Sequence, residues 1–201
     1  MLIFQASRYN WSYLNMPSLI FKIADQPEEF EQIFRLNYKT FVEEIPQHER
    51  NEERRLVDKF HAENTYLICM DGARLLGMLA VRDKRPFSLD LKLENLDSYL
   101  PPHRSICEIR LLAVEPDRRR TRVFTGLIQF LSRYCDEHEY DLGIMSGTTL
   151  QLDLYRHLGF TPFGPLVGRV GALYQPMYST LASYEKFKSS TPILAGKKAH
   201  Q

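Results

Sequence analysis

A buried strand that runs into an arginine-rich turn and then a helix is the feature that most constrains how this chain folds. Residues 109–114 are apolar apart from Arg110, as in a central strand, and Pro116 ends the strand because proline donates no ladder hydrogen bond. From Val123 to about His138 the apolar residues recur at the spacing of a helix face. The turn between the two elements carries positive side chains: Arg118, Arg119, Arg120 and Arg122.

The start of this helix, next to the arginines, predicts a binding site for an anion. The first turn of a helix has unpaired N–H groups and a partial positive charge, so it attracts anions. Cations oppose that charge unless a bound anion offsets them. The pattern therefore favours an anion site over the alternative, a solvated helix cap.

The turn and a second motif together resemble a known family. The turn reads Val114-x-Pro116-x-x-Arg119, and residues 154–160 read Leu-Tyr-Arg-His-Leu-Gly-Phe. They resemble the acyl-CoA-binding motif and the tyrosine-bearing helix of the GCN5-related N-acetyltransferase (GNAT) superfamily. The resemblance extends over roughly residues 20–180.

This resemblance implies a fold and a donor site. The fold is α/β (α+β), with a mostly antiparallel sheet splayed between its fourth and fifth strands and flanked by helices. The donor is a thioester, acyl-CoA or acyl-phosphopantetheine, used as a co-substrate and not as a permanently bound cofactor. The residues implied in binding it are Val114, Arg118, Arg119, Arg120, Thr121, Arg122, Val123 and Phe124.

The turn departs from the superfamily at its glycines. The superfamily loop reads Arg/Gln-x-x-Gly-x-Gly/Ala, and here Arg122 and Phe124 stand where the glycines belong, while Gly126 comes too late. Glycine there lets bare backbone approach phosphate oxygens. A donor held by arginine side chains resembles the acyl-homoserine-lactone synthases and the N-acyl amino acid synthases. Members of those branches commonly take acyl chains from acyl carrier protein.

Two residues are candidates for the chemistry of acyl transfer. Tyr155 matches the tyrosine that protonates the departing thiolate in the superfamily; the alternative is an aromatic side chain packed on the core. Glu108 and Arg110 leave the same face of one strand. Either they form an ion pair, or Glu108 takes the proton of the incoming amine, directly or through water.

The acceptor side resembles the same synthases less closely. Phe41 and Asp58 match them in kind, and Phe41 is a candidate for substrate binding together with Arg110. Other matching positions have lost the synthases' charged residues, which argues against lactone formation from S-adenosylmethionine: Asn37, His61 and Ala80. The N-acyl amino acid synthases are therefore the closer comparison.

Two further residues have open roles. Ser146 either lines the substrate pocket or belongs to a strand-to-helix loop, and the loop is favoured. His61 is interpreted as a surface or capping residue in preference to a base.

Other segments complete the expected organisation. The clearest is a hairpin of residues 65–70 and 74–82 around Asp71-Gly72. Residues 83–103 form a long connection that is either functional or holds a small helix. The remaining expected elements are strands at 18–24, 105–114, 141–145, 160–163 and 168–179, the last with Pro176 at an edge, and helices at 149–157 and after a cap at Asp25.

Length and composition limit the class of protein. The chain of 201 residues is expected to form one domain at residues 18–185, with an N-terminal arm at 1–17 and a disordered tail at 186–201. A net charge of +1 gives no general attraction to nucleic acid. The 3 cysteines lack a metal-binding spacing, and no apolar run is long enough for a membrane span, so we expect a soluble cytoplasmic protein without a metal.

The function expected from these features is N-acyl transfer from a thioester to a primary amine of a small molecule such as an amino acid. Acyl carrier protein is a possible partner, and the oligomeric state is open. The alternatives are a conventional acetyl-CoA-dependent N-acetyltransferase, or a non-catalytic domain that senses a ligand or binds a partner.

Overall fold

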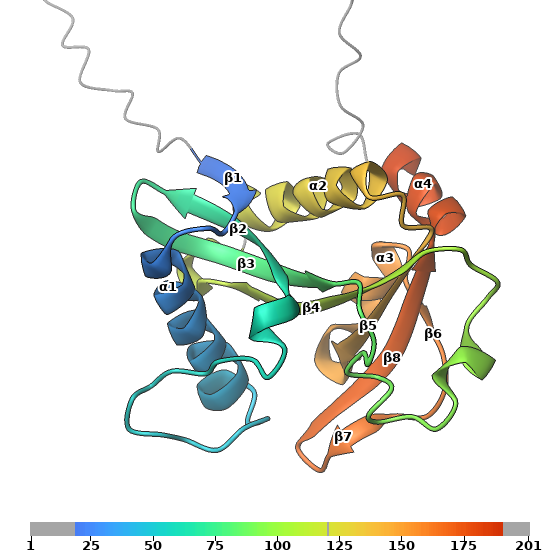
Figure 1. Cartoon of the computed structure of the whole chain (residues 1–201), viewed down its shortest axis with the longest axis horizontal. Helices are drawn as coiled ribbons and strands as arrows, with labels where there is room; N and C mark the ends of the chain where they lie inside the picture. Colours follow the sequence, from blue (N-terminus) through green and yellow to red (C-terminus); the bar gives the residue numbers. More distant parts are fainter. Residues whose placement is uncertain (1–18, 120, 191–201) are drawn as a thin grey trace, which may run out of the picture.

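The computed structural model describes residues 19–119 and 121–190, and its fold is α/β (Figure 1). A single sheet has the strand order β1-β2-β3-β4-β5-β8-β6, with β7 paired to β8. The strands are β1 Leu19–Ile23, β2 Thr65–Asp71, β3 Arg74–Arg82, β4 Ile106–Val114, β5 Leu142–Thr148, β6 Thr161–Pro162, β7 Val167–Arg169 and β8 Ala172–Thr180. The helices are α1 Pro27–Tyr38, α2 Arg122–Glu137, α3 Leu152–His157 and α4 Leu181–Ser190.

The sheet opens between β4 and β5, as expected. These two strands pair in parallel only over Ile106–Glu108 and Leu142–Ile144. Beyond that point β4 stays with β3 and β5 stays with β8, and the other described strand pairs are antiparallel. The prediction of a mostly antiparallel sheet with a splay at this position is confirmed.

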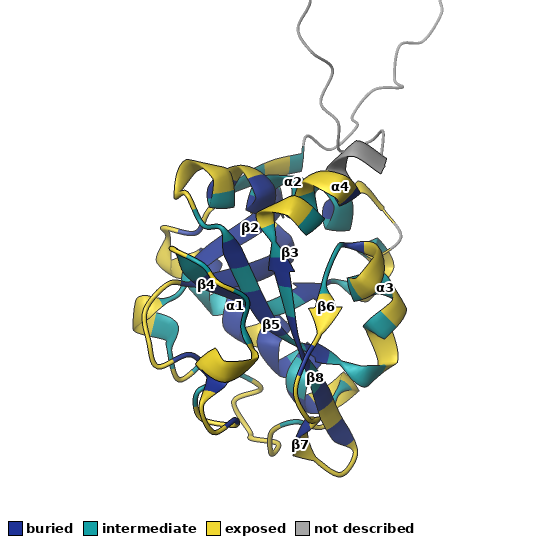
Figure 2. Cartoon of the chain, turned by 90° about the vertical axis from the view of Figure 1, so that its right-hand side faces the viewer, coloured by how far each residue is buried: buried dark blue, intermediate teal, exposed yellow. Residues whose placement is uncertain are grey.

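Helices cover both faces of the sheet. Because side chains alternate along a strand, Ile68 of β2 packs with α1 while its neighbour Leu67 packs with α2. Ile33 of α1 and Leu127 of α2 are fully buried in these two layers. Figure 2 shows the middle of the sheet as buried and the outward surfaces of α2, α3 and α4 as exposed.

A bulge in β4 lies where the sheet splays. Met78 pairs with Ala113 and Ala80 with Arg110, so β4 has one residue more than β3 between these pairs. Leu111 has a φ of 54°, a left-handed conformation that is unusual for a side chain of this kind. The bulge turns Leu111 toward the α1 layer and Leu112 toward the α2 layer.

The start of α1 differs from the expected cap. The carboxylate of Asp25 accepts hydrogen bonds from the side chains of Lys22 and Gln26 at 2.6 and 3.0 Å, so it is directed at these side chains and not at the first turn of the helix. The helix begins after Gln26, and Glu29 accepts from the backbone N–H groups of Asp25 and Gln26 at 3.0 and 3.2 Å. The predicted cap at Asp25 is therefore wrong, although the helix itself is present.

The C-terminal strands also differ from the prediction. The single strand expected at 168–179 is a hairpin of β7 and β8, and β8 lies between β5 and β6 and not at an edge. Pro176 is tolerated there because β6 pairs with Met177 and β7 with Tyr174, which leaves Pro176 between the two pairings. The prediction that Pro176 lies on an edge strand was therefore wrong.

The segment after β8 is helical. Helix α4 buries Phe187 against Ile128 and Leu158. Lys186 to Ser190, the beginning of the expected tail, therefore belong to this helix. The arm at 1–17, Arg120 and residues 191–201 lie outside the described residues. Among the helices that the structure describes, none combines the length and the apolar character needed to cross a membrane.

Candidate active site

The arginine turn joins β4 to α2 as predicted. Thr121 caps α2, and its hydroxyl accepts a hydrogen bond from the N–H of Val123 at 3.3 Å. Arg119 donates from Nε to the carbonyl of Val114 at 3.1 Å and pairs with Glu44. Arg118 pairs with Asp117 at 3.3 Å. Two of the arginines that were expected to bind the donor are thus paired with carboxylates. An anionic donor at this turn would have to compete with Asp117 and Glu44 for these arginines.

Gly126 has a packing role. A Cβ at this position would lie 2.1 Å from Cζ of Phe21, so the ring from β1 rests directly on the backbone of α2. The glycine in this helix therefore serves the contact between β1 and α2. This agrees with its place too late in the sequence to stand in for the glycines of the donor loop.

Tyr155 lies in the opening between β4 and β5. Its ring packs on Gly147 of β5, where a Cβ would come within 2.7 Å of the ring. Burial raises the pKa of Tyr155, and a hydrogen bond with the backbone of Thr148 lowers it by less. The phenol therefore keeps its proton at neutral pH, as an acid requires.

Ser146 shares this opening. Strand β5 continues to Thr148, so Ser146 belongs to the strand and the favoured loop interpretation is wrong. Strand β5 pairs with β8 along its whole length, which explains why β5 extends beyond the predicted end at residue 145. The hydroxyl of Ser146 is buried and has no hydrogen-bond partner among the described residues. Ser146, Tyr155, Phe41 and Leu111 line a space of about 100 Å³, which we call the splay cavity.

Glu108 and Arg110 form the ion pair that was one of the two alternatives. Glu108 is 0% exposed and accepts from the N–H and hydroxyl of Ser88 at 2.9 and 2.5 Å. Arg110 reaches Glu108 at 3.3 Å and Asp58 at 2.8 Å. The Nε–H of Arg110 is buried and without a partner in the described part of the chain. Arg110 is thus fixed by two carboxylates, while its buried Nε–H stays unpaired among the described residues.

A second arginine supports this pair and was missed in the sequence. Arg82 is 1% exposed, pairs with Glu63 and donates to the carbonyl of Pro86 at 3.1 Å. The ring of Phe60 contacts both Arg82 and Arg110, whose guanidinium carbons are 4.1 and 4.7 Å from its centroid. Ala80 is one of the positions at which a charged residue of the synthases is missing. Arg82 lies two residues further along β3, so its side chain leaves the same face of the strand.

The ion pair borders a wide space of about 530 Å³ on the α1 side of the sheet. We call it the charged cavity. It shares Phe41, Arg110, Ser146 and Tyr174 with the splay cavity. Its ionisable lining residues are His48, Asp58, Lys59, Lys92, Glu108, Arg110 and Tyr174.

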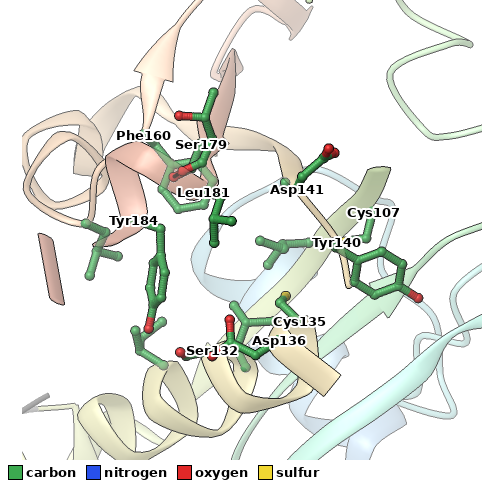
Figure 3. A pocket seen from close by; sticks show the side chains of 16 residues that line it. Cys107, Ser132, Cys135, Asp136, Tyr140, Asp141, Phe160, Ser179, Leu181 and Tyr184 are labelled. Atoms are coloured by element: carbon green, nitrogen blue, oxygen red, sulfur yellow. Dashed lines mark hydrogen bonds between the residues drawn. The ribbon is translucent and has the colours of Figure 1, made fainter. Parts of the chain in front are cut away.

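A different space lies on the α2 side. The apolar cleft, about 70 Å³, runs between α2, α4 and the ends of β5 and β8 (Figure 3). Its wall includes Cys107 of β4, Ser132 and Cys135 of α2, and Leu181 and Tyr184 of α4. It shares these residues with the splay cavity: Ile109, Ile128, Leu131, Leu158 and Phe160. The splay cavity therefore joins a charged space on one face to an apolar one on the other.

His61 lies apart from these spaces. Its ring packs edge-on against Phe30 and Phe34, with centroids 5.3 and 4.9 Å apart, and its Nδ1 is 3.3 Å from the hydroxyl of Tyr66. It is half-buried and does not line the charged cavity. The geometry agrees with a packing role and not with that of a base.

Sequence comparison identifies the family. A family model described as N-acyl amino acid synthase FeeM matches residues 32–178. The chain belongs to this family. It is a GNAT-type N-acyltransferase, in the synthase-like branch that the two motifs predicted. No curated protein matches the chain.

Solved structures share the fold of this family member. The CoA-dependent acyl-homoserine lactone synthase BjaI, solved with MTA, has a TM-score of 0.66 and 20% identity, covering 87% of this chain and 86% of BjaI. FeeM, an N-acyl amino acid synthase from uncultured soil microbes, has a TM-score of 0.63 and 16% identity, covering 89% and 98%. The acyl-homoserine-lactone synthase LasI has a TM-score of 0.63 and 15% identity, covering 85% and 96%.

Proposed function

We propose that this enzyme moves an acyl group from a thioester to the primary amine of a small molecule such as an amino acid. The observation that carries the proposal is the junction at Tyr155 and Ser146. There a charged cavity and an apolar cleft meet through one opening in the sheet. A reaction that joins a polar amine to an apolar acyl chain needs both environments on either side of the reacting atoms.

The two spaces divide the substrates between them. The acceptor amine occupies the charged cavity, where Phe41 and Arg110 contact it. The acyl chain occupies the apolar cleft, where each buried CH₂ contributes about 0.8 kcal/mol. The cleft is small, so a long acyl chain requires the side chains of Leu181 and Tyr184 to move.

The residues at the junction supply the groups that the chemistry needs. The amine nitrogen attacks the thioester carbonyl, a C–N bond forms, and the C–S bond breaks. The hydroxyl of Ser146 donates to the oxygen that becomes negative, and its lack of another partner supports this role. Tyr155 transfers its proton to the departing sulfur, and the raised pKa of its phenol supports this assignment. The proton that the amine nitrogen loses as the amide forms passes to the tyrosinate, directly or through water, and restores the acid.

Glu108 acts on Arg110 in this proposal. Its two oxygens already accept three hydrogen bonds, from the N–H and hydroxyl of Ser88 and from Arg110, which hold the carboxylate against these groups. We therefore favour the ion-pair alternative, in which Glu108 and Asp58 hold Arg110 for the acceptor. The base role of Glu108 is the competing assignment and has its own test below.

The donor is acyl carrier protein in our proposal, with acyl-CoA as the alternative. The loop carries arginine and phenylalanine where backbone would approach the CoA pyrophosphate. Arg118, Arg119, Arg120 and Arg122 would then dock the acidic surface of the carrier and the phosphate of phosphopantetheine. A small contact of this kind is electrostatically steered and sensitive to salt.

The test compares one acyl group on two carriers. Octanoyl-acyl carrier protein and octanoyl-CoA are offered with the same amine across a range of ionic strength. We expect turnover with the carrier-bound thioester and a KM that rises steeply with salt. Equal turnover with octanoyl-CoA, with little dependence on salt, would refute the carrier as donor and make the arginines a grip on CoA phosphates. Turnover confined to acetyl-CoA would instead favour conventional N-acetylation.

A further inference from the structure

The segment between β3 and β4 holds a lysine at the charged cavity. Lys92 lies on this connection, and its backbone N–H donates to the carbonyl of Leu89 at 3.0 Å. Leu89 and Leu93, on either side of it in the chain, are buried in the core. These anchors fix the backbone that carries Lys92.

Further contacts fix the same segment to the site. Asp90 pairs with Arg85 at 2.7 Å and accepts from the N–H of Phe87 at 2.7 Å. Ser88 donates to Glu108, as described above. The long connection is thus a packed support for Lys92, held to β4 by the same carboxylate that holds Arg110.

The charges around Lys92 are unequally satisfied. Arg110 takes both nearby carboxylates, Asp58 and Glu108. No carboxylate in the described residues lies within ion-pairing distance of Lys92, whose Nζ is 5.8 Å from the ring centroid of Tyr174. Tyr174 also lines the splay cavity, so the ammonium lies over a wall that leads to the reacting centre.

The surroundings make an added negative charge favourable. Although Lys92 as a residue is exposed, burial of its ammonium is the largest cause that lowers its pKa. Arg110 and Lys59 lower it further, and only Glu108 opposes them. Asp58 and His48 also line this cavity. An anion bound beside Lys92 would offset the cost of the shielded charge.

We propose that Lys92 forms an anion subsite of the charged cavity and selects acceptors that carry a carboxylate beside the amine. The inference rests on the proposed acyl transfer, and it names a residue that determines which amines are used. The amine points toward Ser146 in the splay cavity, and the carboxylate is held over Tyr174 by the ammonium. An amine without a carboxylate makes no ion pair with Lys92, so Lys92 does not strengthen its binding.

The test compares matched acceptors and matched variants. The best acceptor from a panel of proteinogenic amino acids is paired with the amine that lacks only its carboxylate. Lys92→Met should raise KM for the amino acid by roughly 10- to 100-fold and leave KM for the amine within about twofold. Lys92→Arg should retain most of the preference, because it keeps the charge. Lys84→Met, an exposed lysine of the same connection that does not line the cavity, is the control and should change neither value.

Each contrary outcome has a distinct meaning. An equal loss for both acceptors in Lys92→Met, or no loss for either, would overturn the anion subsite. A wild-type enzyme that acylates amines but no amino acid would overturn it as well. A wild-type enzyme that acylates neither would instead refute the proposed function, so the two failures can be told apart.

Discussion

The charged cavity and the apolar cleft lie on opposite faces of one strand, and their contrast explains how β4 is built. Glu108 and Arg110 line the charged cavity, while Cys107 lines the cleft. The alternation of side chains along a strand is enough to sort polar from apolar residues in this way. The splay adds the opening at which the two environments meet.

The largest effect that would break this contrast is loss of the buried carboxylate. Glu108→Gln removes one partner of a buried ion pair, which costs about 3 kcal/mol of folding stability. If Glu108 only holds Arg110, activity should fall by the same factor at every pH. Chemical denaturation and a pH–rate profile measure both quantities, with Glu94→Gln, an exposed position on the same connection, as the control. A loss that is greatest at low pH and recovers as the amine deprotonates would assign the base role to Glu108.

The next effect concerns the junction itself. Tyr155→Phe should lower turnover by about 100-fold or more and leave donor binding intact. Burial raises the pKa of Tyr155 above its usual value of 10.0, so the phenol of the wild-type enzyme stays protonated at neutral pH. The wild-type rate should therefore fall through loss of this acid only above pH 10.0. Thiol release in the steady state measures the rate. An unchanged rate in the variant would remove Tyr155 from the mechanism.

These first two predictions differ in how far the sequence could have led to them. The strand, the turn and the helix around Arg119 follow from periodicity, and the position of Tyr155 follows from a motif in which Leu-Gly-Phe fixes the spacing. The contacts of Glu108 could not be read in the same way, because Ser88 lies in an aperiodic connection. Only the folded sheet brings that connection against β4.

Other features gave no sequence signal for a physical reason. The bulge at Leu111 is not marked by a glycine, since leucine itself takes the left-handed conformation. Helix α4 begins directly after β8, and its polar composition is similar to that of a disordered tail. Only the structure shows that Phe187 of this helix packs on Ile128. Arg82 is charged yet buried, which no composition rule anticipates without its partner Glu63.

The cleft side of the contrast can be tested by filling it. Ser132 is buried and lines the cleft but not the splay cavity. Ser132→Leu should exclude about two methylenes of a long acyl chain, which at about 0.8 kcal/mol each lowers turnover with octanoyl and palmitoyl thioesters about tenfold. Turnover with an acetyl thioester should stay the same. Arg133→Leu, on the exposed side of α2, is the control, and an equal loss for all chain lengths would place the acyl chain elsewhere.

The smallest effect is expected at the donor turn, outside both spaces. Arg119 already pairs with Glu44, so part of its charge is offset. Arg119→Glu should raise KM for a carrier-bound donor several-fold at low salt and less at high salt, because salt screens exposed charges. Kinetics at two ionic strengths measure the change, with Arg133→Glu as the matched exposed position on α2. The same rise in both variants would deny the turn a specific role.

The most direct test of the account is the identity of the product. The enzyme is supplied with an octanoyl thioester and the panel of amino acids, thiol release is followed, and N-acyl products are quantified by mass spectrometry. The account predicts one N-octanoyl amide for each thiol released, and loss of both in Tyr155→Phe. Thiol release without an N-acyl product, or no release with any thioester, would contradict it.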